Sequence, residues 1–337
     1  MKQHMTRIKH PYIGYLLMGI GLLFLPSLAA MGLIKNSVVT SVGGVLFYGI
    51  AALGFNILLG YSGLISLGTA GFMGVGAYAS AYFVENMGLP FFLSLFLSVL
   101  IPVLIGLLVG LVSLRIEGIY LAIATLCVSE ILRKTFEEFA DVTNGFAGKN
   151  ASYPVLPFIG QLTRTQTYYL IVVILIIMVM ITHNIVNGKI GRAFNAMRGS
   201  EAAAQAMGIS LLKYRLMAFA LATAYASLSG VLYVHYIRGS FPTNWTMSLS
   251  LNILAIVVIG GLRSIYGTLL GAFVVFGIPD IVIKQIPVIK DIPGVSYIFN
   301  GVLIILVILF YPHGVIGIFQ DIKRLFQKAV AKIGGKQ

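Results

Sequence analysis

The chain has 337 residues, of which 58% are hydrophobic and 10% are charged, and its mean hydropathy is +0.96. Soluble domains carry about 25% charged residues, so this composition excludes an ordinary soluble protein and predicts a polytopic membrane protein. Backbone groups in lipid must hydrogen-bond within their own segment, and the apolar runs are continuous, so the predicted fold class is an all-α transmembrane helical bundle. The single cysteine, Cys127, excludes a disulfide framework and a cysteine-based metal site.

About ten apolar stretches, within one transmembrane domain over 1–337, are interpreted as spans. They lie at 12–34, 38–59, 64–84, 91–114, 118–133, 168–186, 211–237, 248–262, 265–286 and 297–318. The first has a basic head and is too long for a cleaved signal, so we expect it to remain as a span.

If every span crosses the membrane in turn and both termini are cytoplasmic, most of the 23 lysines and arginines lie on the cytoplasmic side. This distribution follows the positive-inside rule. The net charge of +13 therefore needs no nucleic-acid partner. We expect the basic tail 323–336 to lie against anionic headgroups of the lipid bilayer.

The stretch 60–81 is rich in glycine and small polar residues. Small residues let helices pack closely in lipid, and this is the favoured role for most of these glycines. Glycine is also tolerated where a helix breaks beside a cavity. In that second interpretation, Ser62, Ser66 and Thr69 line or gate a translocation path.

Two ionisable residues, Glu130 and Arg133, lie near the outer end of the span 118–133. Such groups are costly in a membrane and usually face the bundle interior or water. Their spacing allows them to pair. A structural ion pair is the simpler interpretation, and a role in passing or sensing a zwitterionic solute is the alternative.

The longest outside loop is 134–167, which is either an extracytoplasmic cap over a path or a plain connector. We expect Lys134, Glu137 and Glu138, at its start, to be solvated. Elsewhere in the spans, we expect interhelical hydrogen-bond partners at Asn56, His235, Asn252 and Asn300. Lining of the translocation path is the alternative role for each, and Asn252 is counted with Ser62, Ser66, Thr69, Glu130 and Arg133 as a candidate for it.

Known catalytic patterns are missing from the sequence. It has no G-x-x-x-x-G-K-[ST] loop to hold nucleotide phosphates, no H-E-x-x-H and no nucleophile elbow. We therefore expect a chain that is not an enzyme and binds no cofactor or metal. If transport runs on ATP, the ATPase is another chain.

The segment 191–219 is polar, alanine-rich and basic within an otherwise apolar sequence. We expect a helix over 191–208, in which Arg198 and Glu201 pair at i, i+3. On a helical wheel, the polar residues fall on one half, and the other half carries Phe194, Met197 and Met207. Such a helix either docks in a groove of a soluble partner or lies on the headgroups.

Glu201-Ala202-Ala203, followed by Gly208, resembles the EAA loop, or coupling helix, of ATP-binding-cassette (ABC) importer permeases. The usual glycine follows after three residues and here after four, which fits the branched-chain amino acid permeases. Four further blocks are similar to that family, at 55–79, 126–148, 258–272 and 310–319. The chain departs from the pattern where Asn144 and Arg263 replace glycines and where Asn252 stands at a frequent glutamate.

The resemblance implies a permease of a bacterial cytoplasmic (inner) membrane, similar to the longer-loop member of a heterodimer. It implies a second permease, two cytoplasmic ATPases that use ATP and Mg²⁺, and an extracytoplasmic solute-binding protein. The coupling residues that it implies are Gly191, Arg192, Arg198, Glu201, Ala202, Ala203 and Gly208.

Substrates in that family are Leu, Ile and Val, with relatives that carry urea, short amides or other amino acids. Two alternatives outside the family remain open: an ion-coupled secondary transporter, with Glu130 or Asp280 as the acidic candidate, and a passive channel.

Overall fold

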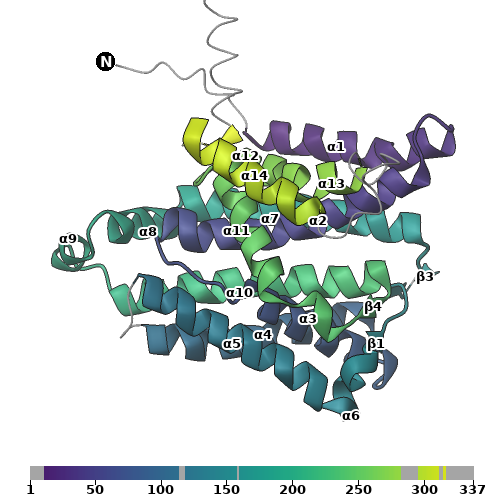
Figure 1. Cartoon of the computed structure of the whole chain (residues 1–337), viewed down its shortest axis with the longest axis horizontal. Helices are drawn as coiled ribbons and strands as arrows, with labels where there is room; N and C mark the ends of the chain where they lie inside the picture. The colour runs from purple at the N-terminus through teal and green to yellow at the C-terminus, as the bar shows by residue number, and fades with distance from the viewer. Residues whose placement is uncertain (1–10, 114–117, 158, 282–294, 311–313, 316–337) are drawn as a thin grey trace, which may run out of the picture.

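The computed structural model of the chain describes residues 11–113, 118–157, 159–281, 295–310 and 314–315, which are mostly helical (Figure 1). Among these residues, 6 helices are long and apolar enough to cross a membrane: Tyr12–Ala30, Asn36–Tyr61, Phe91–Leu111, Arg164–Asn187, Leu211–Ile237 and Pro242–Gly260. The chain is therefore a multi-pass membrane protein. The count of about ten spans stays a prediction. The ends of the expected spans 265–286 and 297–318, and the basic tail, lie outside the described residues.

The long helices of the N-terminal half are α1 (Pro11–Ala30), α2 (Asn36–Phe55), α3 (Thr69–Glu85), α4 (Phe91–Ser113), α5 (Ile119–Glu138) and α7 (Arg164–Asn187). The helices that follow, long and short, are α8 (Lys189–Gly199), α9 (Glu201–Ala206), α10 (Leu211–Ile237), α11 (Met247–Gly260), α12 (Ile265–Ala272), α13 (Ile278–Ile281) and α14 (Val295–Phe310). Two π-helices, Asn56–Tyr61 and Phe273–Gly277, continue α2 and α12 without a break.

Helix α10 lies at the centre of the bundle and packs against α2, α3 and α4. Glycines permit this packing, because a Cβ on Gly230 would overlap the carbonyl of Met73, and one on Gly76 would overlap the backbone of Ser227. The helix backbones of α3 and α10 are thus in direct contact. The packing interpretation of the glycine-rich stretch is confirmed at Gly76.

Helix α3 begins at Thr69, so the expectation of a helix from residue 64 is wrong. Residues 62–68 are not helical, although three of them are large and apolar. The chain leaves the π-helix at Gly63, whose φ of 79° lies in the left-handed region that favours glycine. A second interruption, over 261–264, separates α11 from α12 and contains Gly261 at φ 108° and Arg263 at φ 63°.

Helix α5 continues to Glu138 rather than ending near residue 133. The described residues in the rest of the expected loop 134–167 include α6 (Ala140–Thr143), a 3-10 helix (Gly145–Ala147) and three short strands, β1 (Lys149–Asn150), β2 (Val155–Leu156) and β3 (Gly160–Gln161). Strand β1 pairs with β4 (Gly239–Ser240), and β2 pairs with β3, both antiparallel. Helix α7 then begins at Arg164, after Thr163 has capped it.

His235, near the end of α10, forms hydrogen bonds that connect the loop 134–167 to the helices. Its Nδ1 donates to the carbonyl of Ser152 at 2.7 Å, and its Nε2 bonds the hydroxyl of Ser80 at 2.9 Å. The expectation that His235 is a hydrogen-bond partner between segments is confirmed.

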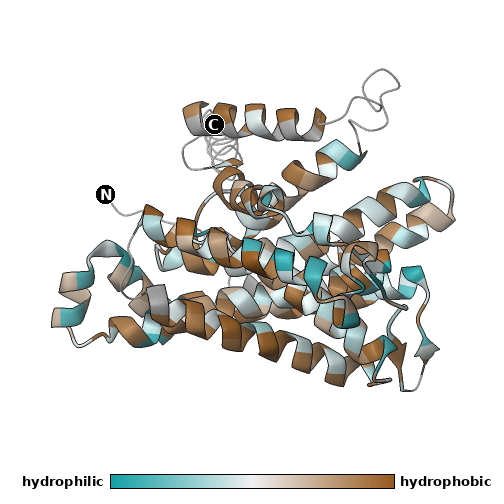
Figure 2. Ribbon diagram, turned by 60° about the horizontal axis from the view of Figure 1, so that its bottom comes forward, coloured by the Kyte–Doolittle hydropathy of each residue, from teal (hydrophilic) through white to brown (hydrophobic). Residues whose placement is uncertain are grey.

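The two ends of the bundle differ. Helices α8 and α9 lie at one end, whereas α6, β1, β3 and β4 lie at the other (Figure 1). Hydrophobic residues run along the helices between these ends, and hydrophilic residues gather toward the ends (Figure 2). The expected coupling segment and the expected outer loop thus occupy opposite ends.

Candidate functional site

The alanine-rich segment forms two helices, α8 and α9, so the expectation of one helix over 191–208 is wrong. Ser200 separates them with an extended backbone (φ −161°, ψ 116°). Its hydroxyl accepts a hydrogen bond from the backbone N–H of Ala203 at 3.3 Å. Serine is a favoured N-cap, and here it ends α8 and starts α9. Gly208 ends the segment at φ 80°.

Helix α8 is held to the bundle by its apolar side. Phe194 and Met197 are buried in the main core cluster, as the helical wheel predicts. Gly191 allows the sharp turn from α7, since a Cβ there would overlap the backbone of Val186. Met207, expected on the same apolar side, is 69% exposed because it follows the end of α9.

Helix α9 presents small side chains outward. Only Ala204 of its six residues is buried, whereas Ala202 and Ala203 are exposed. Arg192 of α8 is exposed as well. The two helices therefore present a surface of short alanine side chains, with the basic residue Arg192 beside it.

Arg198 and Glu201 do not pair with each other, which corrects the expected i, i+3 bridge. The extended residue Ser200 breaks the helical spacing on which that bridge depends. Arg198 instead donates to the carbonyl of Gly60, in the π-helix after α2. Glu201 forms an ion pair with the buried guanidinium of Arg215, in α10.

An open groove of about 480 Å³ lies between the glycine-rich loop and the junction of α8 and α9. Ser62, Arg198 and Glu201 are among its lining residues. The structure thus brings one of the expected path residues to the coupling segment. Ser66 and Thr69 do not line this groove and are buried. The hydroxyl of Ser62 donates to the carbonyl of Leu58 at 2.6 Å.

Asn56 joins the two helix interruptions. Its Nδ2 donates to Thr268 Oγ1 at 2.8 Å and to the Ser264 carbonyl at 3.3 Å, and its Oδ1 accepts from the Arg263 N–H at 3.0 Å. Tyr61 Oη also donates to the Arg263 carbonyl, at 2.8 Å. The interhelical role expected of Asn56 is confirmed. Sequence reasoning missed its partners, because nothing in the sequence indicates that 56 and 263–268 adjoin.

Helix α11 contributes a further contact to the glycine-rich region. The hydroxyl of Ser250 accepts a hydrogen bond from the backbone N–H of Ala70 at 3.0 Å, at the start of α3. Asn252 lies two residues further along α11 and is partly buried.

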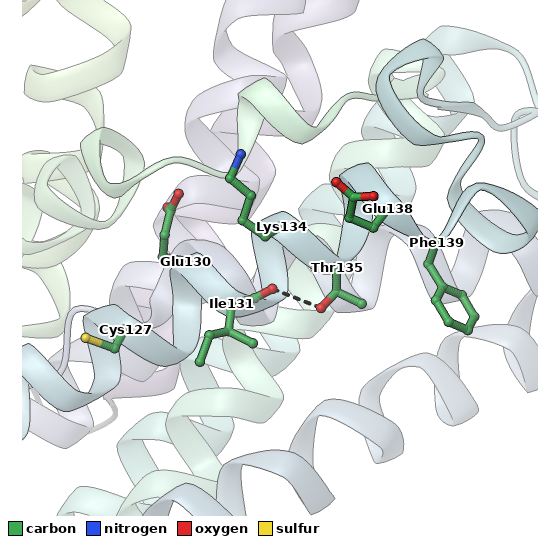
Figure 3. Close-up of a pocket in the computed structure, with 7 residues that line it drawn as sticks. All are labelled: Cys127, Glu130, Ile131, Lys134, Thr135, Glu138 and Phe139. Carbon is green, nitrogen blue, oxygen red and sulfur yellow. Dashed lines mark hydrogen bonds between the residues drawn. The ribbon is translucent and has the colours of Figure 1, made fainter.

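Charged side chains are concentrated along α5 (Figure 3). Arg133 Nε donates to both oxygens of Glu130 at 2.9 and 3.0 Å, which confirms the expected pair. Arg133 also bonds Glu137, and Lys134 Nζ donates to Glu137 at 2.7 Å. The expectation that Glu137 is solvated is wrong, since its side chain is only 4% exposed. These i, i+3 and i, i+4 pairs stabilise the extra turn of α5.

A shallow groove of about 600 Å³ follows the outer face of α5. Its lining residues are Cys127, Glu130, Ile131, Lys134, Thr135, Glu138 and Phe139 (Figure 3). Glu130 lies within this groove, two turns before the end of α5, rather than at the end of its helix. Among the described residues, no group of three or more His, Cys, Asp or Glu is arranged to hold a metal ion.

Comparisons with known proteins agree on one family. The family model described as "Branched-chain amino acid transport system / permease component" matches residues 37–308. The chain is 28% identical to the high-affinity branched-chain amino acid transport system permease protein LivM of Escherichia coli (strain K12), over 80% of this chain and 68% of that protein.

Two probable branched-chain amino acid transport permease proteins of Methanocaldococcus jannaschii are also similar. LivM is 27% identical over 66% of this chain and 67% of its own length, and LivH is 26% identical over 61% and 66%. No solved structure matches the chain.

Proposed function

Because the chain belongs to the family of permease components of branched-chain amino acid transport systems, we propose that it is a transmembrane subunit of an ABC importer. It carries leucine, isoleucine and valine across the cytoplasmic membrane of a bacterium. As a permease component, it is a transport subunit and not itself an enzyme.

The proposal includes separate partners for energy and for solute capture. Two cytoplasmic ATPases hydrolyse ATP with Mg²⁺ and dock on α8 and α9. A solute-binding protein docks at the opposite end, near α6 and β1 to β3, and selects the solute. A second permease completes the membrane part. The separation of the two expected docking surfaces at opposite ends of the bundle supports this division (Figure 1).

The observation that carries the proposal is the double attachment of the α8–α9 segment. Arg198 ties it to the Gly60 carbonyl in the π-helix, and Glu201 ties it to Arg215 in α10. Through Asn56, the π-helix is also bonded to the interruption before α12. A displacement of α8 and α9 by the ATPases therefore moves α2, α10 and α12 together.

Such a displacement switches the bundle between two packings in a rigid-body transition, which changes the side to which its path opens. Ser62 and Ser66 occupy the segment that would move first, between the π-helix and α3, and Thr69 is the first residue of α3. In this mechanism these residues gate the path, and Asn252, on the neighbouring α11, belongs to it.

The docking role of α9 is tested by Ala203→Arg, because Ala203 is exposed and a long cation there would block a close contact. We expect uptake of radiolabelled leucine and stimulated ATPase activity to fall at least about tenfold, the effect of losing roughly 1.4 kcal/mol or more of coupling. Met87→Arg, an exposed residue in the α3–α4 connection, is the matched control and should retain both activities. Normal coupling in Ala203→Arg would contradict the docking role.

The role of the Glu201–Arg215 pair is tested by charge reversal. Glu201→Arg should uncouple ATP hydrolysis from uptake, since it places two cations together. Adding Arg215→Glu restores an ion pair and should recover part of the uptake. The choice of solute is tested by measuring uptake of urea, acetamide and other amino acids in the same assay. Uptake that depends on the ATPase subunits distinguishes an ABC importer from an ion-coupled carrier.

A further inference from the structure

A cavity of about 300 Å³ lies among α1, α2, α7 and α12, apart from the α5 groove and the coupling segment. From α1 it is lined by Met18 and Leu22, about 10 and 16 Å along a helix of about 30 Å, which places it near the middle of the membrane. The described residues that line it are apolar, with Tyr266 as the one that carries a polar group. An apolar cavity of this kind stays dry but accepts a hydrocarbon.

Tyr266, at the start of α12, bounds the cavity on the side nearer to α8. A Cβ on Gly14 would overlap the Tyr266 hydroxyl, so the ring lies directly against α1. The ring also packs on that of Tyr15, with centroids 5.0 Å apart. Past this contact the cavity separates α12 from α1, and two of its lining residues, Tyr266 and Phe273, are 38% and 43% exposed. The cavity therefore opens sideways, toward the lipid.

Polar groups gather next to Tyr15, toward the end of the bundle that carries α8. Tyr15 Oη lies 3.1 Å from His183 Nδ1, and Tyr12 Oη donates to Asn184 Oδ1 at 2.6 Å. We call these four residues, from α1 and α7, the α1–α7 rim. Tyrosine is enriched where a membrane protein crosses the level of the lipid headgroups. The rim therefore marks that level, and the cavity lies deeper in the membrane than the rim.

The rim borders a basic surface. Lys189, at the start of α8, and Arg192 are both exposed and follow the rim residues of α7 in the chain. The sequence has no acidic residue before Glu85 and none between Asp141 and Glu201, so α1, α2, α7 and α8 carry no negative side chain. Basic pockets between helices on the cytoplasmic side of a membrane bind anionic headgroups. The charge at this end of the bundle thus favours an anionic lipid over a zwitterionic one.

We propose that the cavity binds one acyl chain of an anionic phospholipid, whose headgroup lies at the α1–α7 rim beside Lys189. The chain follows the exposed edge of Tyr266 from the rim into the cavity. With α8 on the cytoplasmic side, as in the proposed function, the lipid belongs to the cytoplasmic leaflet. The leaflet is the one part of this inference that rests on the proposed function.

The contacts in the cavity distinguish this lipid from the lipids that surround any membrane protein. A surrounding lipid touches one helix face, whereas a chain in the cavity touches Met18 of α1, Leu46 of α2 and Leu175 of α7 as well as α12. Each of these side chains would lose dispersion contacts if the cavity were left unfilled. The bound lipid is therefore held more tightly than its neighbours and remains with the purified protein.

The test is the binding of phospholipid by the purified transporter, assembled with both permeases and the ATPases, followed by native mass spectrometry. The complex is delipidated in detergent and titrated with phosphatidylglycerol or with phosphatidylcholine of the same acyl chains. Met18→Trp and Leu270→Trp narrow the cavity from opposite walls, and both residues are only half-buried. Leu17→Trp, which adds the same ring at a position 63% exposed on α1, is the matched control.

We expect the wild-type complex to bind phosphatidylglycerol at least about tenfold more tightly than phosphatidylcholine, a difference of roughly 1.4 kcal/mol. Each cavity variant should weaken the binding of phosphatidylglycerol at least about tenfold, whereas Leu17→Trp should bind it as the wild type does. Lys189→Gln should weaken the binding of phosphatidylglycerol and leave that of phosphatidylcholine unchanged, because it removes only a charge. Lipid bound by the other permease is the same in all these complexes.

Thermal midpoints show which variants assemble correctly, and either cavity variant alone is sufficient for the comparison. Phosphatidylglycerol binding that a correctly assembled cavity variant does not weaken would overturn the cavity as the site. Equal affinity for the two lipids would overturn the anionic headgroup. The measurement involves no leucine and no nucleotide, so either failure would leave the proposed function intact, and leucine uptake by the same complex tests that function separately.

Discussion

Asn56 is the residue through which the two interrupted segments of the chain are bonded. Both ends of its amide are used, by a side chain and two backbone groups of 263–268. The residue is almost fully buried, so none of these bonds is replaced by water when it is lost. Its contribution is therefore larger than that of an exposed asparagine.

We expect Asn56→Leu to lower the stability of the purified protein by about 1–3 kcal/mol, because it leaves the Arg263 N–H without its acceptor. The measurement is the thermal midpoint in detergent. Asn187→Leu is the matched control, since Asn187 is exposed near the end of α7. Equal midpoints for the two variants would contradict the role of Asn56.

The partners of Arg198 and Glu201 show which contacts of single residues cannot be predicted from the sequence. That these residues lie in an exposed basic segment can be predicted from the polar, alanine-rich composition. Their partners, Gly60 and Arg215, cannot, because the pairing depends on the turn at Ser200 and on the packing of distant helices. A single extended residue is enough to separate two side chains that a continuous helix would bring together.

At the scale of elements, the contact between α3 and α10 depends on glycine. We expect Gly230→Ala to push these helices apart, since the added Cβ would overlap the Met73 carbonyl. A loss of about 1–3 kcal/mol, typical of overpacking, should appear as a lower thermal midpoint and a lower yield of folded protein.

The control for this substitution is Gly21→Ala in α1, where a Cβ would meet nothing within 4 Å. Alanine favours helix over glycine by about 1 kcal/mol, so this variant should be neutral or slightly stabilised. If both variants behaved alike, close packing would not explain the glycine in α10.

Apolar runs locate most helices in the sequence, and α10 has the bounds 211–237 that its run indicates. They fail where apolar residues are not helical, as at Leu64, Ile65 and Leu67, which follow a glycine with positive φ. They also fail at α5, where paired charges continue the helix beyond its apolar run. Hydropathy records the preference of each side chain for lipid, but not these local backbone and ion-pair effects.

At the scale of the whole molecule, the separation of α8 and α9 from the ordered loop predicts opposite sidedness. Met207→Cys and Phe146→Cys place exposed thiols at the two ends, in a Cys127→Ser background. An impermeant maleimide should label Phe146→Cys in intact cells and Met207→Cys only in inverted vesicles, prepared without the ATPases. Labelling of both from the same side would contradict the proposed topology.

Helix α3 has consequences for how the chain is made. It has 17 residues, follows a non-helical segment and packs against α4, α5 and α10. A nascent segment enters the bilayer from the translocon according to its own hydrophobicity. Hydrophobicity alone does not favour the insertion of α3, which is short, or of α5, which is charged. Synthesis at about 5–20 residues per second delivers α10 roughly 8–30 seconds after α3. The early helices must therefore be retained beside the translocon, incompletely assembled, until the helix that completes their surroundings emerges from the ribosome.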